Sequence, residues 1–351
     1  MSKEVSIGAL RNFGFIRLVI LFCAFNYFFY YKNFFNKIFV IWSLTLLVVI
    51  IDTYIESFTG RNILGYGEEY RERIVSFFKD EPIVGGYINA FYLIIIGYFF
   101  SLKSKFSGNY KYFILIVSMC FFLAILLTGE RSNTIKAILG FFVFYFVNDY
   151  FNIKEKLFSI FILSILFVFL INSSNFLNLR YKSQLVDPII SLYQSKVNNT
   201  EYDETILKDI RKSLYFAHYQ SGLSVFKSYP FFGVGNKNYR LEVCIENKKP
   251  NYICDIHPHQ TYFEFLAEHG LIGTVILLFI FFNLIFSKFK IILESKNYIQ
   301  IGSLIFLLSP FLPFLPTGSF FGDYNLTIFW INLSLMYSIS KKTNIFQKIN
   351  T

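Results

Sequence analysis

The sequence is short of charged residues. Only 16% of its 351 residues are charged, whereas 54% are hydrophobic, and the mean hydropathy is +0.48. This composition excludes an ordinary soluble domain, which needs more polar surface. Because the apolar residues form long unbroken runs, we expect an all-α integral membrane protein with several spans.

The chain also has few residues that bind metals or form disulfides, with four histidines and four cysteines. His257 and His259 alone are a weak metal signal, because no second ligand pair lies at a zinc-finger distance. Cys244 and Cys254 lie ten residues apart, and a disulfide between them in an oxidising compartment would add about 3 kcal/mol of stability. The first apolar run lacks a small-residue cleavage site, so we expect a retained span.

The hydropathy pattern predicts a bundle of about nine or ten transmembrane helices. We divide the chain into an N-terminal bundle over 1–171, a large periplasmic loop subdomain over 172–270, and C-terminal helices with a cytoplasmic tail over 271–351. Within the loop subdomain, the residues from Thr200 to Asp203 predict a capping box for a helix that ends before Tyr229. The nine candidate spans are 13–31, 34–51, 83–101, 112–128, 132–147, 157–171, 271–286, 298–314 and 320–339.

Basic residues are distributed unevenly between the loops. Alternate loops and the C-terminal tail contain lysine but no arginine and few acids, so the positive-inside rule places them in the cytoplasm. The acid-rich stretch 52–82 and the long segment 172–270 then face outward. Nine spans require an outward N-terminus, which Lys3, Arg11 and Arg17 disfavour. The same rule explains the net charge of +10, so we expect no nucleic-acid partner.

A titratable cluster leads directly into an apolar segment at 257–274. Pro258 favours a helical first turn, and Gly270 supplies a stop signal before the apolar run that begins at Leu271. We therefore expect His259 in the first turn of a short helix, whose positive end keeps the imidazole neutral and able to accept a proton. Such a group is suited to act as a general base. The four histidines His218, His257, His259 and His269 all lie in the outward segment.

The same residues carry a family resemblance. The order His259-Gln260, nine residues, then Gly270-x-x-Gly273 resembles the signature of the bacterial O-antigen ligase and O-antigen polymerase superfamily. The upstream Pro-Phe-Phe-Gly-Val-Gly stretch at 230–235 adds to this resemblance. The resemblance implies an inner-membrane glycosyltransferase with its active site on the periplasmic face. Its donor would be a glycan on an undecaprenyl-pyrophosphate carrier, and its acceptor a hydroxyl of a glycan or lipid A core.

Arginine suits this chemistry, because planar guanidinium groups stabilise the charge that develops on a leaving pyrophosphate. Arg131, in a tight turn between two spans, and Arg211 resemble arginines typical of the family, and Arg73 fits a looser pattern. The resemblance therefore implies His259, Arg211 and Arg131 as catalytic residues, with no metal and no cofactor. The candidate substrate-binding residues are Arg73, Gln260, His257, Gly233 and Gly235.

Several interpretations remain open at this level. Gly233 and Gly235 could form a phosphate-binding nest, although a tight turn toward His259 is the simpler interpretation. We expect Glu264 and Glu268 on a solvated face, and Cys23 and Cys120 as packing residues. A polymerase of repeat units would share the chemistry of a ligase, and transfer to protein is a third member reaction. A lipid-linked glycan flippase is the alternative of another class, but the spans are nearly free of charge and Pro310, Pro313 and Pro316 are their only broken-helix signal.

Overall fold

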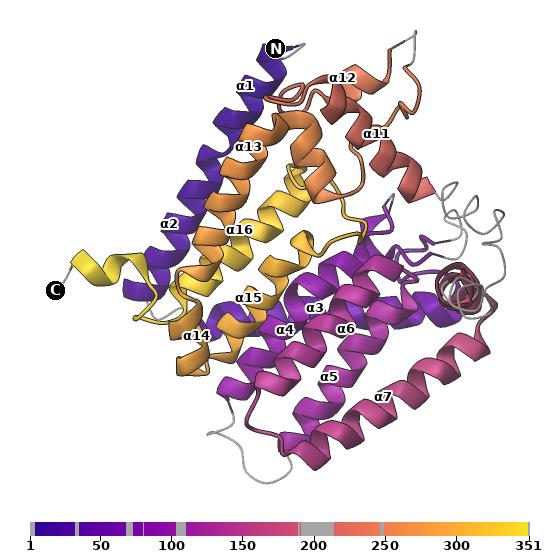
Figure 1. Ribbon diagram of the computed structural model, residues 1–351. Helices are drawn as coiled ribbons and strands as arrows, with labels where there is room; N and C mark the ends of the chain where they lie inside the picture. Colours follow the sequence, from indigo (N-terminus) through magenta and orange to yellow (C-terminus); the bar gives the residue numbers. More distant parts are fainter. Residues whose placement is uncertain are drawn as a thin grey trace. The chain divides into compact units, whose positions relative to one another are not determined.

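A computed structural model describes residues 4–31, 35–67, 73–79, 81–102, 110–188, 190, 214–245 and 249–349, and Figure 1 shows its helices. No strand occurs among these residues, which confirms the all-α fold class. The α-helices are α1 (Val5–Gly14), α2 (Ile16–Tyr31), α3 (Phe35–Thr59), α4 (Val84–Ser101), α5 (Tyr110–Leu127), α6 (Arg131–Val147), α7 (Ile153–Ser173), α8 (Asn175–Leu177), α11 (Leu214–Ser228), α12 (Tyr239–Val243), α13 (Thr261–Phe286), α14 (Phe289–Ser295), α15 (Tyr298–Leu308) and α16 (Asp323–Ser338). A π-helix covers Asn178–Val186, and short 3-10 helices cover Ser76–Phe78, Ser309–Phe311 and Ile345–Ile349.

Each of the nine predicted spans contains a helix among the described residues. Within the described part of the chain, six helices are long and apolar enough to cross a membrane. They are Gly8–Tyr31, Phe35–Thr59, Val84–Ser101, Tyr110–Leu127, Ile153–Ser173 and Thr261–Ser295. The helices at the other three predicted spans, α6, α15 and α16, are shorter than 18 residues. The predicted multi-span membrane protein is therefore confirmed.

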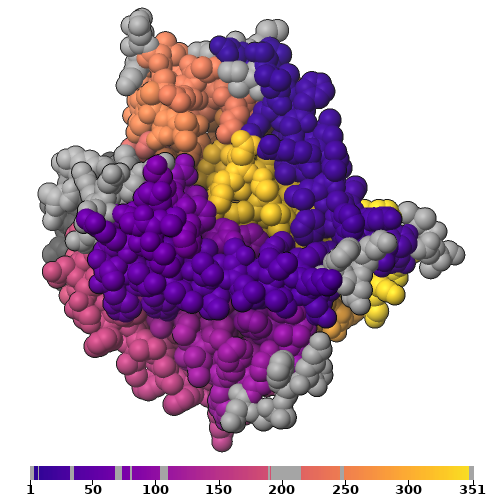
Figure 2. Space-filling view, turned by 180° about the vertical axis from the view of Figure 1, so that it is seen from behind, coloured from indigo at the N-terminus to yellow at the C-terminus, as the bar shows by residue number. Residues whose placement is uncertain are grey.

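The chain forms two compact units, and the second comprises Asn26–Ile190, Ile291–Phe306 and Leu335–Thr351. Helix α4 lies at its centre, packed against α3, α5 and α6, and its Tyr92, Ile94 and Ile95 side chains are fully buried. By contrast, α3 lies at the surface that Figure 2 shows, and it exposes Ile41, Leu44 and further apolar side chains. An exposed apolar helix face of this kind fits contact with lipid.

The first unit comprises Met1–Phe25, Ser191–Lys290 and Leu307–Ser334. Its core lies where α11 packs on α13, around the buried residues Val225, Tyr239 and Ala267. As predicted, α11 ends at Ser228, immediately before Tyr229, whereas the predicted capping box at 200–203 lies outside the described residues. The division at residues 171 and 270 stays a prediction.

The N-terminal helix is fixed to this first unit by polar contacts. The backbone N–H of Glu4 donates to Asn238 Oδ1 at 3.0 Å, and Asn236 Nδ2 donates to Asn12 Oδ1 at 2.9 Å. Helix α1 therefore begins beside the segment that precedes His259. Arg11 and Arg17 both pair with Asp323, with Arg11 Nη1 2.6 Å from Asp323 Oδ1. The single carboxylate of Asp323 offsets one of these two positive charges.

Candidate functional site

Helix α13 is interrupted at Gly270, where the predicted stop signal lies. Gly270 has φ 62° and ψ −170°, so the helix bends there and four backbone groups lose their helical partners. The 230–235 stretch, which we call the latch, satisfies these groups. Leu271 N–H donates to Pro230 O at 2.8 Å and Ile272 N–H donates to Phe231 O at 3.2 Å. In the opposite direction, Val234 and Gly235 N–H donate to the carbonyls of Ala267 and Glu268 at 3.0 and 2.8 Å.

The two glycines at the centre of this arrangement approach each other's backbone closely. A Cβ at Gly233 would lie 2.4 Å from the carbonyl carbon of Glu268, and one at Gly270 would lie 2.3 Å from that of Phe231. Both glycines also have positive φ, which disfavours any other residue. The N–H groups of Gly233 and Gly235 already donate within the protein, so these contacts favour the tight turn over the phosphate nest.

The prediction that Glu264 and Glu268 lie on a solvated face of α13 is wrong. Glu264 and Glu268 are 1% and 2% exposed. Glu264 accepts hydrogen bonds from Ser319 Oγ at 2.6 Å and from Phe320 N–H at 2.8 Å, so it ties the loop before α16 to α13. Helical spacing alone could not reveal this, because the loop that buries Glu264 lies 55 residues further along the chain.

His259 precedes α13 and is not in its first turn as we expected. The helix begins at Thr261, and Gln260 is its N-cap, with Oε1 accepting from the N–H groups of Tyr262 and Phe263 at 2.7 and 3.1 Å. The side chain of Gln260 is 2% exposed, so the candidate substrate-binding residue serves as a helix cap in this structure. His259 has φ 56°, and its carbonyl accepts a hydrogen bond from Thr317 N–H at 2.9 Å.

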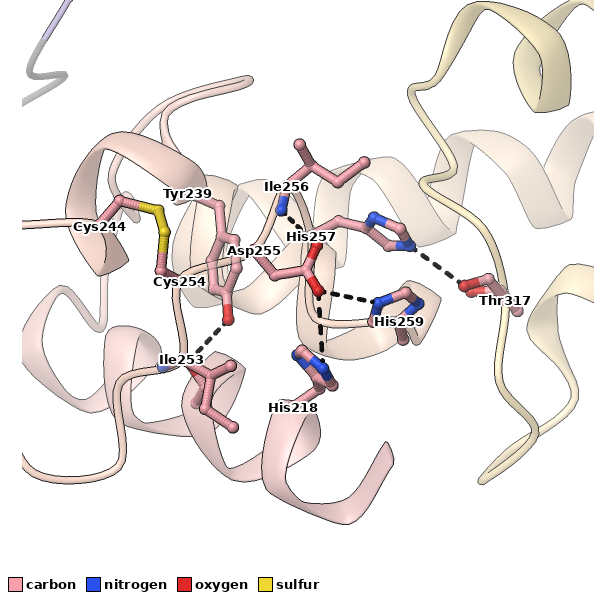
Figure 3. Close-up of polar contacts among 11 residues, drawn as sticks. His218, Tyr239, Cys244, Ile253, Cys254, Asp255, Ile256, His257, His259 and Thr317 are labelled. Atoms are coloured by element: carbon pink, nitrogen blue, oxygen red, sulfur yellow. Dashed lines mark hydrogen bonds and ion pairs between the residues drawn. A yellow bond between two sulfur atoms is a disulfide. The ribbon is translucent and has the colours of Figure 1, made fainter. Parts of the chain in front are cut away.

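Three imidazole rings and one carboxylate meet at this position (Figure 3). His259 Nε2 lies 3.3 Å from Asp255 Oδ2, and His218 Nε2, from α11, lies 3.6 Å from the same oxygen. His257 Nε2 lies 3.3 Å from the carbonyl oxygen of Thr317, and its ring centroid is 4.2 Å from that of His259. The side chains of His259 and Asp255 are 29% and 28% exposed, whereas His218 is buried.

The electrostatic environment keeps the two supporting imidazoles neutral and the carboxylate ionised. Burial lowers the pKa of His257 to about 4, and the nearby His259 also contributes. Burial, together with His259, lowers the pKa of His218. Burial alone would raise the pKa of Asp255, but the Ile256 N–H and the His259 ring outweigh burial, so this pKa lies below its ordinary value.

A disulfide joins Cys244 to Cys254 in the structure, with a Cα–Cα distance of 4.5 Å. It links the end of α12 to the residue directly before Asp255. The loop that carries Asp255, His257 and His259 is therefore held at one end by the disulfide and at the other by the Gln260 cap. Neither the disulfide nor the cap requires a helix or a strand within the loop.

The candidate arginines lie elsewhere in the chain. Arg131 is the first residue of α6, and its Nη1 donates to the Gln184 carbonyl at 3.0 Å. Arg180 approaches the same residue, donating from Nη1 to Gln184 Oε1 at 3.2 Å and from Nε to Gly129 O at 3.1 Å. Two guanidinium groups thus gather on the turn between α5 and α6.

Arg73 and Arg211 are the other two candidate arginines. Arg73 Nη2 lies 3.5 Å from Pro82 O. Burial raises the pKa of Glu130, and the charge of Arg73 is one of the smaller effects that oppose this rise. This proximity favours a role as partner of Glu130. Arg211 lies outside the described residues, and its role stays a prediction.

Sequence reasoning missed Asp255, His218 and Arg180 as site residues. A signal was present for Asp255, which lies four residues before His259 and directly after a candidate disulfide cysteine. His218 was noticed only as one of four histidines. Arg180 lies 49 residues after Arg131 in the sequence, and no local pattern connects the two residues.

Comparison with known families adds an independent result. Residues 114–278 match the family model described as O-antigen ligase. This region runs from α5 into α13 and contains Arg131, the latch and His259. Among curated proteins, none matches the chain.

This match, which covers slightly less than half of the chain, supports the O-antigen ligase and polymerase superfamily. Members of this family are glycosyltransferase-like enzymes that act on lipid-linked glycans at membranes. The predicted type of function, O-antigen ligase or polymerase, is confirmed at this general level. The apolar helices and the family together indicate a multi-pass membrane protein.

Proposed function

We propose that the protein transfers a glycan from a polyprenyl-diphosphate carrier to an acceptor sugar hydroxyl, with His259 as the general base. The contact between His259 Nε2 and Asp255 Oδ2 at 3.3 Å carries this proposal. The reaction would take place on the periplasmic face of the bacterial inner membrane. We favour ligation onto a glycan or lipid A core over polymerisation, because the His-Gln spacing matches the ligase pattern.

The Asp255 contact defines which nitrogen of His259 acts. An ionised carboxylate only accepts hydrogen bonds, so His259 Nε2 must carry the proton that it donates to Asp255. The lone pair of the neutral ring is then on Nδ1, which is the basic atom. Asp255 also stabilises the imidazolium that forms when Nδ1 takes a proton, as the carboxylate does in a Ser-His-Asp triad.

The reaction then proceeds by a single displacement. His259 Nδ1 takes the proton from the acceptor hydroxyl as that oxygen attacks the anomeric carbon. The bond between this carbon and the diphosphate oxygen breaks, and its electron pair stays on the diphosphate. We propose that Arg131 and Arg211 bind the diphosphate and stabilise this charge, with Arg180 as a further candidate because it shares Gln184 with Arg131.

The decisive experiment is transfer from a purified carrier-linked glycan to defined acceptors by the protein in nanodiscs. His259→Ala should reduce the rate roughly 100- to 10,000-fold, the usual contribution of a positioned general base. Ile256→Ala is a matched control, since Ile256 is a neighbouring side chain that is 58% exposed. Transfer by His259→Ala at the normal rate would reject the assignment.

A second experiment distinguishes ligase from polymerase, which share this chemistry and differ in the acceptor. Deleting the gene of a polymerase removes long glycan chains. Deleting the gene of a ligase leaves long chains on the carrier without attachment to their acceptor. The glycan pool of the deletion strain therefore decides between the two.

A further inference from the structure

We propose that His218, Asp255 and His259 form a binding site for a divalent transition-metal ion of the Zn²⁺ type, and that this ion inhibits the enzyme. The binding half of the proposal stands on geometry alone. The inhibition half rests on the proposed role of His259 as a base. The two halves are therefore tested by different measurements.

The three side chains lie close to the arrangement of one face of a tetrahedral site. In such a site, metal–ligand bonds of about 2.0 to 2.1 Å place neighbouring ligand atoms about 3.3 to 3.4 Å apart. Asp255 Oδ2 lies 3.3 Å from His259 Nε2 and 3.6 Å from His218 Nε2. All three ligand atoms lie within 4.8 Å of one another. A small closing movement of the two rings is enough to complete the triangle.

The donor atoms suit zinc more than calcium or magnesium. Two imidazole nitrogens and one carboxylate oxygen are typical zinc ligands, whereas the hard cations prefer oxygen alone. Three protein ligands leave a fourth position for water. His257 does not belong to the set, because its Nε2 faces the Thr317 carbonyl. His259 and Asp255 are partly exposed, which gives an ion a path from the solvent.

The surroundings indicate reversible binding. Metal-bound histidines usually donate their other N–H to a carboxylate or carbonyl, and losing such a partner reduces metal affinity 10- to 100-fold. His218 Nδ1 is buried and has no hydrogen-bond partner among the described residues. Binding should therefore be weaker than at a structural zinc site, so a chelator should remove the ion.

Bound metal would block catalysis by changing which nitrogen of His259 carries the proton. A neutral imidazole has one proton and one lone pair on its ring nitrogens. A metal ion at Nε2 uses that lone pair, so the proton moves to Nδ1. Nδ1 then has no lone pair with which to take the proton of the acceptor hydroxyl. Metal binding at Nε2 requires the tautomer with its proton on Nδ1, whereas catalysis requires the tautomer with its proton on Nε2. The ion therefore prevents proton transfer from the acceptor while it is bound.

The binding test uses full-length, tag-free protein in nanodiscs without any glycan. After chelator treatment, the protein is titrated with Co²⁺, whose visible absorption reports tetrahedral coordination, and with Zn²⁺ by calorimetry. We expect one equivalent to bind, and His218→Ala to weaken binding at least tenfold. His269→Gln is the matched control, because His269 packs against Phe265 and Phe321, away from this cluster. Size-exclusion profiles confirm that each variant is folded.

Absence of saturable binding, or equal binding by wild type and His218→Ala, would overturn the metal site. The inhibition test compares transfer with and without Zn²⁺, each variant normalised to its own metal-free rate. Zn²⁺ should suppress wild-type transfer, excess chelator should restore it, and His218→Ala should need at least ten times more Zn²⁺. Metal binding with an unchanged or increased rate would overturn inhibition. If His259→Ala transfers normally, the proposed function fails while the binding result still stands.

Discussion

His259 is positioned through both its backbone and its ring. Its φ of 56° lies in the left-handed region, which a residue other than glycine enters at a cost of about 1 to 2 kcal/mol. The hydrogen bond from Thr317 N–H to the His259 carbonyl holds this conformation. At the ring, Asp255 holds Nε2. In the proposed mechanism, these contacts orient the ring so that Nδ1 is the basic atom.

Replacing Asp255 with asparagine should therefore impair catalysis more than binding. Asparagine fits the space but can present an N–H donor to His259 Nε2, which favours the wrong tautomer. We expect kcat to fall by roughly 100-fold or more, as for the analogous change in a Ser-His-Asp triad, with little change in KM. Steady-state kinetics with Asp149→Asn, a change at an exposed aspartate, provides the control. An unchanged kcat would show that Asp255 does not orient the base.

Glu130 should give the second unit a pH-dependent stability. Its oxygens accept from Gly85 N–H at 2.7 Å and from Asn133 Nδ2 at 2.6 Å, joining α4 to α6. Burial raises the pKa of Glu130 above that of the unfolded chain. Its contribution to the free energy of unfolding is thus fully present below the unfolded pKa, about 4.3, and is lost as pH rises through the folded pKa.

Glu130→Gln cannot titrate, so the difference in melting temperature between wild type and this variant should change as pH increases above about 4.3. Thermal unfolding in detergent over a pH series measures this, with the exposed Glu81→Gln as the control. A difference that is independent of pH would contradict the assignment. The sequence placed Glu130 beside Arg131 but could not show its burial, which depends on the start of α4.

At the scale of elements, the bend in α13 and the latch depend on each other. Each provides the hydrogen-bond partners that the other lacks, and both glycines allow the backbones to meet. Two of the resembling motifs, the glycines of 230–235 and Gly270, therefore have a structural role. They set where α13 bends, and so they fix the short helix that follows His259.

Gly270→Ala should disrupt this joint. Its Cβ would lie 2.3 Å from the Phe231 carbonyl carbon, and alanine at φ 62° adds a conformational cost of about 1 to 2 kcal/mol. Because the obstructing atom belongs to the backbone, the latch must move away. We expect the melting temperature to fall by several degrees and transfer to be lost. Gly14→Ala in α1, where no atom lies within 4 Å of the added Cβ, should have neither effect.

The helices could be predicted from the sequence, whereas the polar contacts between loops could not. A segment that crosses the membrane must satisfy its backbone hydrogen bonds internally. An apolar run of span length therefore predicts a helix, such as α3 or α4, without knowledge of the segments that pack against it. Gly270 was found because glycine interrupts a helix locally. The position of His259 before the helix depends on Gln260 as cap and on Thr317, 58 residues away, and no local pattern contains that contact.

At the scale of the whole molecule, the remaining question is which ends face the same side of the membrane. Glu4 bonds to Asn238, so the start of α1 and the segment before His259 lie on one side of the first unit. Arg11 and Arg17 are paired with Asp323, whose single carboxylate weakens the charge argument against an outward N-terminus. From the positive-inside rule, we expect the lysine-rich tail on the other side of the membrane.

Cysteine labelling in intact cells tests this arrangement. We expect a membrane-impermeant maleimide to label Glu4→Cys and Ile256→Cys, both exposed positions, and to label Lys341→Cys only after the membrane is permeabilised. The background carries Cys23→Ser and Cys120→Ser, since these two thiols are free, whereas Cys244 and Cys254 are bonded to each other. Labelling of Glu4→Cys only after permeabilisation, with Ile256→Cys labelled in intact cells, would show that α1 does not begin beside Asn238. Labelling of Lys341→Cys in intact cells would reverse the assignment of the lysine-only loops. Labelling of Ile256→Cys only after permeabilisation would place His259 on the side opposite to the one proposed for the polyprenyl-diphosphate donor.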